Sequence, residues 1–122
     1  MPHAAETQAH IALHKDYDYF HQPNEINFWI PLVAGVGGSN SLLCESAHGA
    51  EDYTPFEVGF GECMRFWGNQ CRHYTVENKT ETSRVSFDLR VVPKALFDNA
   101  WPSPQGNVCF RLGEFYASVP VP

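Results

Sequence analysis

The stretch RVSFDLRV, residues 84–91, decides the fold class, because polar and apolar side chains alternate along its whole length. Side chains of a β-strand point alternately to its two faces, so an unbroken period of two predicts a strand. Arg84, Ser86, Asp88 and Arg90 share one face, and apolar side chains share the other. In the simpler arrangement the apolar face packs into the core and the polar face meets water. In the alternative, the polar face lines a cavity that binds an anion, and other material covers the apolar face.

Residues 24–33, NEINFWIPLV, alternate in the same way, with Glu25, Asn27 and Trp29 on one face. Nine Gly and nine Pro residues cut the chain into short segments of strand character, and helical periodicity is nearly absent. The expected strands cover residues 9–16, 24–33, 40–46, 55–59, 62–67, 70–77, 82–92 and 107–118. Seven or eight short strands at this spacing predict an all-β domain, a sandwich or a jelly roll.

The chain has 122 residues, which suits a single domain. We expect a core over about residues 9–93, followed by a C-terminal packing segment over 94–122. A helical turn is expected at 94–99. The segment carries several large apolar side chains, so it can cover part of a sheet.

Composition excludes several classes of function. The net charge is −6 and no basic patch stands out, so duplex nucleic acid is not an expected partner. No apolar run approaches the roughly 20 residues of a membrane helix, and the N-terminus lacks a signal-peptide pattern. The four cysteines form no C-x-x-C pair, which argues against a structural zinc site. We expect reduced thiols and a cytoplasmic protein.

A candidate metal site begins with the motif His14-Lys15-Asp16. On a strand, residues i and i+2 point to the same side, so His14 and Asp16 can bind one cation. His73 is the best candidate for a third ligand. Two histidines and one carboxylate form the facial triad of non-haem Fe(II) oxygenases. An H-x-D motif alone is weak evidence, because solvated strand faces also produce it.

Arg84 and Ser86 supply the second half of the candidate site. They follow His73 by eleven and thirteen residues and share one face of the strand. A guanidinium and a hydroxyl placed in this way can bind a carboxylate. A dicarboxylate that chelates a metal with one end requires such a group for its other end.

These motifs resemble a known family. They are H-x-D-x-D-Y from His14, E-I-N-F-W-x-P-L from Glu25, S-L-x-x-E-S from Ser41, F-x-G-N-x-C-x-H ending at His73, and R-V-S-F-D-x-R-V from Arg84. Together they resemble the phytanoyl-CoA-dioxygenase-like members of the Fe(II)/2-oxoglutarate-dependent oxygenases and, among these, the streptomycin-biosynthesis-type proteins. The resemblance covers about residues 10–93 and the tail motif LGEFY at 112–116, and it favours the arrangement in which Arg84 faces a cavity.

The resemblance implies a double-stranded β-helix, or jelly roll, that oxidises a small-molecule substrate. It implies Fe(II) held by His14, Asp16 and His73, and 2-oxoglutarate held by Arg84 and Ser86. The other possible pocket residues are polar or aromatic side chains near these positions: Asn27, Trp29, Glu25, Glu45 and His21.

Family members usually carry further helices and strands before the H-x-D strand, so we expect a reduced domain whose apolar sheet face is covered by a homodimer. Two alternatives remain open. A cupin-like metal protein (an isomerase, a lyase or a 2-oxoglutarate-independent dioxygenase) would share the architecture, and His21 with Glu25 matches part of a cupin motif. A truncated, non-catalytic relative is the other.

Overall fold

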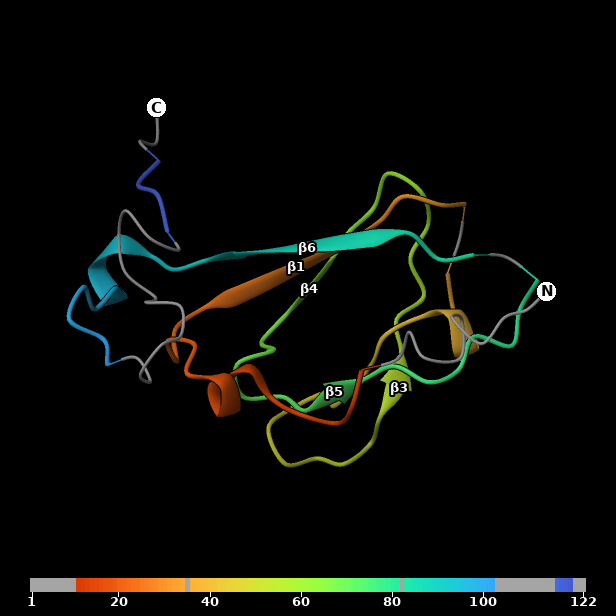
Figure 1. The fold of residues 1–122 in the computed structure, drawn as a ribbon, viewed down its shortest axis with the longest axis horizontal. Coiled ribbons are helices and arrows are strands. Elements are labelled where there is room, and N and C mark those ends of the chain that lie inside the picture. The colour runs from red at the N-terminus through yellow and green to blue at the C-terminus, as the bar shows by residue number, and fades with distance from the viewer. Residues whose placement is uncertain (1–10, 35, 82, 103–115, 120–122) are drawn as a thin grey trace.

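The computed structural model describes residues 11–34, 36–81, 83–102 and 116–119, and in them the chain forms two small antiparallel sheets. The sheets lie as two layers (Figure 1), with strand orders β4-β1-β6 and β3-β2-β5. The strands are β1 (Ile26–Pro31), β2 (Leu43–Cys44), β3 (Thr54–Pro55), β4 (Met64–Phe66), β5 (His73–Tyr74) and β6 (Ser86–Val91). The described chain also has three short 3-10 helices: η1 (Asp16–Tyr19) before β1, η2 (Gly38–Asn40) between β1 and β2, and η3 (Lys94–Leu96) after β6. The prediction of a β-rich fold is confirmed.

The first sheet is built on β1, which pairs with β6 along its whole length and with β4 on its other edge. Asn27 lies opposite Arg90, Trp29 opposite Asp88, and Pro31 opposite Ser86. Residues directly opposite each other in an antiparallel pair point to the same side of the sheet. The polar face of residues 84–91 therefore lies on the same side as Asn27 and Trp29.

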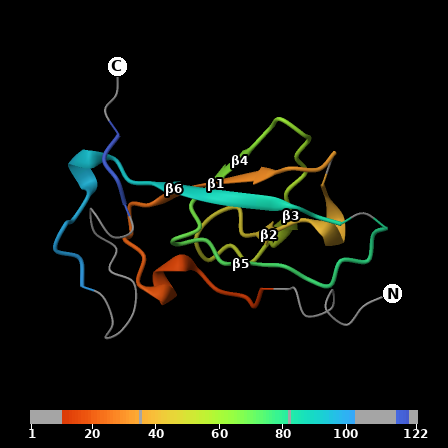
Figure 2. The same cartoon turned by 45° about the horizontal axis from the view of Figure 1, so that its top comes forward.

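That shared side faces the interior. Asn27 is fully buried and Trp29 is 4% exposed, whereas the apolar side chains of β6 are on average nearly half exposed. The simpler arrangement, with the apolar face of residues 84–91 in the core, is therefore wrong. The second sheet lies across from the first (Figure 2), and on the polar face Arg84, Ser86 and Arg90 are partly buried while Asp88 is exposed.

The core between the layers is small and centres on Trp29. Its ring packs edge-on against Phe56, which in turn contacts Phe66. The other buried apolar residues of this cluster are Val36, Leu42, Cys44, Val58 and Cys71. Among the described residues, Cys44 and Cys71 are buried free thiols and Cys63 is an exposed one, and Cys109 lies outside these residues.

Several expected strands are shorter than the sequence suggested. In the described part of the expected strand 9–16, residues 11–16, His14 forms an isolated bridge with His73 and Asp16 already begins η1. Residues 55–59 divide into the end of β3 and a second bridge, at Val58. The strand expected at 107–118 lies largely outside the described residues.

The helical turn expected at 94–99 is present as η3. The residues after η3 form hydrogen bonds with the loop that follows η1. Gln22 exchanges two hydrogen bonds with the backbone of Asp98, and the indole of Trp101 donates to the carbonyl of Phe20. This described part of the packing segment thus supports the loop next to the candidate site, not the apolar face of the first sheet.

In the part of the chain that the structure describes, no helix has the length and apolar character that a membrane span needs.

Candidate metal site

The two histidines are brought together by backbone pairing. His14 and His73 exchange both N–H···O=C hydrogen bonds, at 3.1 and 2.8 Å, which places them side by side at the edge of the second sheet. The pairing continues between Ile11 and Thr75. The two imidazole centroids are 4.5 Å apart. The extended backbone of residues 11–15 therefore pairs with the second sheet and places His14 beside His73, as expected of a strand over residues 9–16.

Asp16 reaches the same point through a turn. Lys15 is extended (φ −118°, ψ 151°), and Asp16 then starts η1. The backbone N–H groups of Asp16 and Tyr17 donate to the carbonyls of Gly68 and Asn69. Because that turn fixes the backbone, the Asp16 side chain is 2% exposed and points back toward the histidines.

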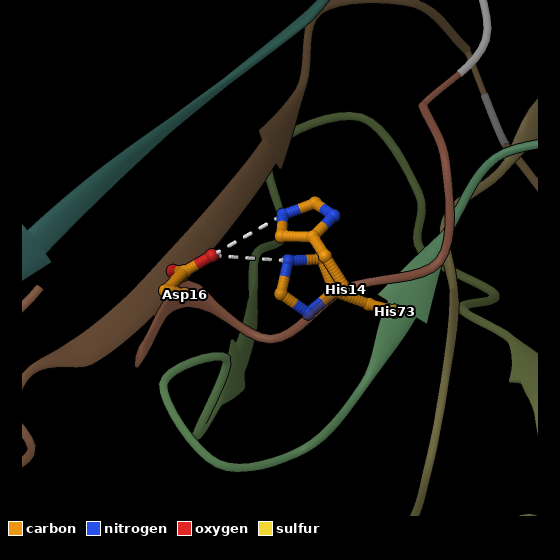
Figure 3. A group of neighbouring side chains, drawn as sticks. All are labelled: His14, Asp16 and His73. Carbon is orange, nitrogen blue, oxygen red and sulfur yellow. Dashed lines mark ion pairs between the residues drawn. The ribbon is translucent and has the colours of Figure 1, made fainter. Parts of the chain in front are cut away.

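The three side chains converge on one point (Figure 3). Asp16 Oδ1 lies 3.5 Å from His14 Nε2 and 3.3 Å from His73 Nε2. One ligand atom from each residue lies within 4.8 Å of the others, a spacing that a metal ion could bridge. The predicted metal ligands are therefore brought together, with His73 buried and His14 partly exposed.

Both imidazoles are oriented by backbone carbonyls. His14 Nδ1 lies 2.8 Å from the carbonyl of Ala12, and His73 Nδ1 lies 2.9 Å from the carbonyl of Cys71. A carbonyl only accepts, so each Nδ1 carries the proton and each Nε2 has a free lone pair when the ring is neutral. Metal-binding histidines in proteins are commonly held in this way. The donor set thus fits a divalent transition-metal ion.

The second oxygen of Asp16 is held from the first sheet. Asn27 Nδ2 donates to Asp16 Oδ2 at 2.9 Å, and Arg90 Nε donates to it at 3.2 Å. Burial opposes ionisation of Asp16. Hydrogen bonds that His14 Nε2 and His73 Nε2 donate when their rings are protonated, the hydrogen bond from Asn27 and the charge of Arg90 together outweigh burial and hold the pKa of Asp16 well below the usual range. The hydrogen bond to Asp16 also raises the pKa of His14, although burial partly offsets this.

Glu25 and His21, two of the predicted pocket residues, lie next to Arg90, which holds Asp16. Glu25 is fully buried, and its Oε1 lies 3.2 Å from Arg90 Nε and 2.8 Å from His21 Nδ1. The Tyr116 hydroxyl donates to Glu25 Oε2. His21 and Glu25 therefore pair with each other. A cupin-like site would require them as metal ligands, but the candidate metal-binding group consists of His14, Asp16 and His73.

Arg84 lies farther along the same interior face. Its guanidinium carbon is 5.5 Å from the centroid of the Trp29 ring, a cation–π arrangement. Among the described residues no carboxylate pairs with Arg84, and burial lowers the pKa of its guanidinium. It borders a pocket of about 200 Å³ whose other lining is mostly hydroxyl and amide side chains: Ser39, Asn40, Ser41, Thr75, Val76, Asn78 and Ser83. Ser86 shares the face of Arg84 but does not line this pocket.

Glu45 has a structural role. Its carboxylate accepts hydrogen bonds from the backbone N–H groups of Arg72 and Glu51, which lower its pKa. Cys44 lies opposite His73 and shares its side of the second sheet, so the neighbouring Glu45 points the other way. It lines a separate open pocket with His48 and Met64. Glu45 was named only as a possible pocket residue, and the pocket that it lines is not the one beside Arg84.

Sequence reasoning missed two groups of the site. Arg90 was placed on the polar face of residues 84–91 but was given no role, and the Gly68 turn was quoted only as part of a motif. The signal for Arg90 was its six-residue offset from Arg84 on one strand face. No local pattern shows that its partners are Asp16 and Glu25, which are distant in sequence.

The chain is similar to one curated protein, the streptomycin biosynthesis protein StrG of Streptomyces griseus. The two are 36% identical over 107 residues, which is 87% of this chain and 50% of that protein. No model of a known protein family matches, and no solved structure matches. The chain spans about half the length of the curated relative, and it is related to that protein over most of its own length.

Proposed function

We propose that this chain is a non-haem Fe(II)/2-oxoglutarate-dependent oxygenase that acts on a small molecule. The observation that carries the proposal is the convergence of His14, Asp16 and His73 in one partly buried group, with both Nε2 atoms directed at Asp16 Oδ1. Two histidines and one carboxylate on one side of an ion leave the opposite side open for other ligands.

We also propose that the two sheets are the halves of a jelly roll. Each sheet is antiparallel, their strands come from interleaved parts of the chain, and the site lies between the layers. β1, β4 and β6 alternate along the sequence with β2, β3 and β5. Crossing of this kind between two facing sheets is typical of the double-stranded β-helix.

Arg84 is the proposed anchor for the far carboxylate of 2-oxoglutarate. A half-buried guanidinium that lacks a carboxylate partner among the described residues is costly unless an anion binds to it. Trp29, over which Arg84 lies, is two residues from Asn27 on the same face of β1, and Asn27 contacts Asp16. Two residues of a strand span roughly 7 Å, so the anchor and the metal face the same interior.

With dioxygen as the oxidant, bound Fe(II) and 2-oxoglutarate would supply the hydroxylation of a substrate C–H bond, coupled to oxidative decarboxylation of 2-oxoglutarate to succinate and CO2. The chain's own residues hold the ligands, bind the carboxylate and limit the access of water. His14 is the more exposed histidine and has the ring of Tyr19 edge-on beside it, so substrate would approach from that side. The name of the curated relative, a biosynthesis protein for a small molecule, agrees with a small-molecule substrate.

Calorimetry under anaerobic conditions tests the proposal. The Fe(II)- or Mn(II)-loaded protein should bind 2-oxoglutarate, and Arg84→Met should weaken that binding by about 2–5 kcal/mol with metal binding retained. Arg65→Met is the matched control, because Arg65 is an exposed arginine of the same sheet that pairs with Phe28 on its outer face.

His14→Ala and His73→Ala should each lose most of the metal, measured by elemental analysis, because two remaining ligands hold a divalent ion poorly. Metal binding without any 2-oxoglutarate binding would refute the proposal and favour the 2-oxoglutarate-independent class. Absence of metal in the wild-type protein after loading would refute both and favour a non-catalytic role.

A further inference from the structure

The guanidinium of Arg90 lies at the centre of a group of carboxylates beside the candidate metal site. Its Nε is 3.2 Å from Asp16 Oδ2 and 3.2 Å from Glu25 Oε1, and its Nη2 is 3.1 Å from Asp88 Oδ2. The Arg90 side chain is 22% exposed, and Asp16 and Glu25 are almost completely buried. Three carboxylates therefore share one guanidinium.

The two oxygens of Asp16 have different partners. Among the described residues, Oδ1 contacts the imidazoles of His14 and His73. Oδ2 accepts hydrogen bonds from Asn27 and Arg90. A free carboxylate can chelate a metal ion through both oxygens. Here two donors fixed on neighbouring strands compete for Oδ2, which leaves Oδ1 as the oxygen available to an ion.

We propose that Arg90 is a positioning residue for the metal: together with Asn27 it holds Asp16 Oδ2, so that Asp16 binds the ion through Oδ1 alone. This inference rests on the proposed metal site and deepens it. A single carboxylate oxygen and two imidazoles fill three of the six positions of an octahedral ion, and a chelating carboxylate would fill a fourth. The arrangement thus keeps one more position open for a co-substrate that itself binds through two atoms.

Glu25 fixes Arg90 in turn. Its buried carboxylate lies 3.2 Å from Arg90 Nε, and it is itself held by His21 and Tyr116. Because Glu25 and Asp88 share the charge of Arg90, the surroundings of Asp16 stay net negative despite the nearby guanidinium. A cation is therefore still attracted to Asp16.

Charge and geometry predict opposite effects, which makes the proposal testable. By Coulomb's law alone, Arg90 repels a metal ion, so its removal would tighten metal binding. If Arg90 acts by positioning, Arg90→Met should instead weaken Co(II) binding by about 10–100-fold, the usual effect of losing a residue that orients a ligand. The visible absorption of bound Co(II) should also change, because it depends on coordination number and geometry.

The experiment titrates Co(II) into the full chain and records affinity and spectrum for the wild type, Arg90→Met, Arg90→Lys and the control Arg65→Met. Arg90→Lys keeps the charge but cannot reproduce the planar guanidinium, whose Nε lies near Asp16 and Glu25 while its Nη2 reaches Asp88. We expect it to weaken binding and alter the spectrum as well, and we expect Arg65→Met to match the wild type. If Arg90→Met does not fold, as judged by circular dichroism, Arg90→Lys decides.

Tighter binding in Arg90→Met, or wild-type affinity and spectrum in Arg90→Lys, would overturn the positioning role. These outcomes leave the proposed function standing, since the wild type still binds metal. Failure of the wild type to bind Co(II) would overturn both. A wild type that binds Co(II) but not 2-oxoglutarate would overturn the proposed function and leave the positioning role of Arg90 standing.

Discussion

The turn at Gly68 offers a sharp test of how the site is held. A Cβ added at Gly68 would lie 2.8 Å from Asn27 Nδ2, 3.0 Å from Asn27 Cγ and 2.8 Å from Cε2 of Phe66. Contacts this short do not occur between relaxed side chains, so Gly68→Ala must displace one neighbour or both. Asn27 donates to Asp16, and the ring of Phe66 packs edge-on against His73. Either displacement reaches a candidate metal ligand.

The size of the destabilisation by Gly68→Ala follows from two effects, the insertion of a methyl group and the displacement of Asn27. Inserting a methyl group into a packed interior typically costs about 1–3 kcal/mol. Loss of the buried hydrogen bond from Asn27 to the ionised Asp16 would by itself account for about 1.5–3 kcal/mol. We therefore expect Gly68→Ala to lower the free energy of unfolding by about 1–3 kcal/mol and to weaken Co(II) binding, since Asp16 loses a donor that orients it.

Urea unfolding of the metal-free protein gives the first quantity, and Co(II) titration gives the second. Gly37→Ala is the matched control, because Gly37 has an extended backbone (φ 178°) and a Cβ there would meet only Glu57 Cγ, at an ordinary 3.5 Å. If Gly68→Ala kept wild-type stability and metal affinity, the close packing of Gly68 against Asn27 would not be what holds the ligand.

Three further outcomes are expected. Asp16→Asn should lose most of the Co(II) affinity in a titration, because a neutral amide replaces the only carboxylate ligand; retained affinity would exclude Asp16 as a ligand. Asn69→Ala should destabilise the chain by about 1–3 kcal/mol in urea unfolding, because its fully buried amide donates to the carbonyls of His21 and Gln22, while the exposed Asn24→Ala should stay within about 0.5 kcal/mol. For the apolar outer face of β6, where Leu89 is 43% exposed, we propose that a second copy of the chain covers it; light scattering should show a dimer that Leu89→Asp disrupts, and a wild-type monomer at all concentrations would refute this.

Local patterns in the sequence determined the chemistry of the site. The i, i+2 spacing places His14 and Asp16 on one side of an extended segment, and the alternation of residues 84–91 puts Arg84 and Arg90 on one strand face. Both statements depend only on backbone geometry over a few residues. The alternation of residues 84–91 held, whereas His14 and Asp16 meet because the turn into η1, and not an extended strand, directs the Asp16 carboxylate back to the histidine.

Only the tertiary structure decided which strand face points inward. Periodicity is symmetric between the two faces of a strand, and the choice depends on what packs across from it. Here the second sheet lies across from the polar face (Figure 2), where Asp16, Asn27, Glu25 and Arg90 contact one another. By hydrophobicity alone the opposite choice would have been made.

The partners of each polar group were likewise a tertiary matter. The Asp16–Arg90 contact joins residues 74 apart in sequence, and the Glu25–Tyr116 contact joins residues 91 apart. Glu45 and Glu25 looked alike in the sequence, yet Glu45 binds backbone N–H groups of a loop and Glu25 binds Arg90. A carboxylate pairs with whichever donor the fold brings within about 3 Å, and short-range sequence patterns carry no information about that distance.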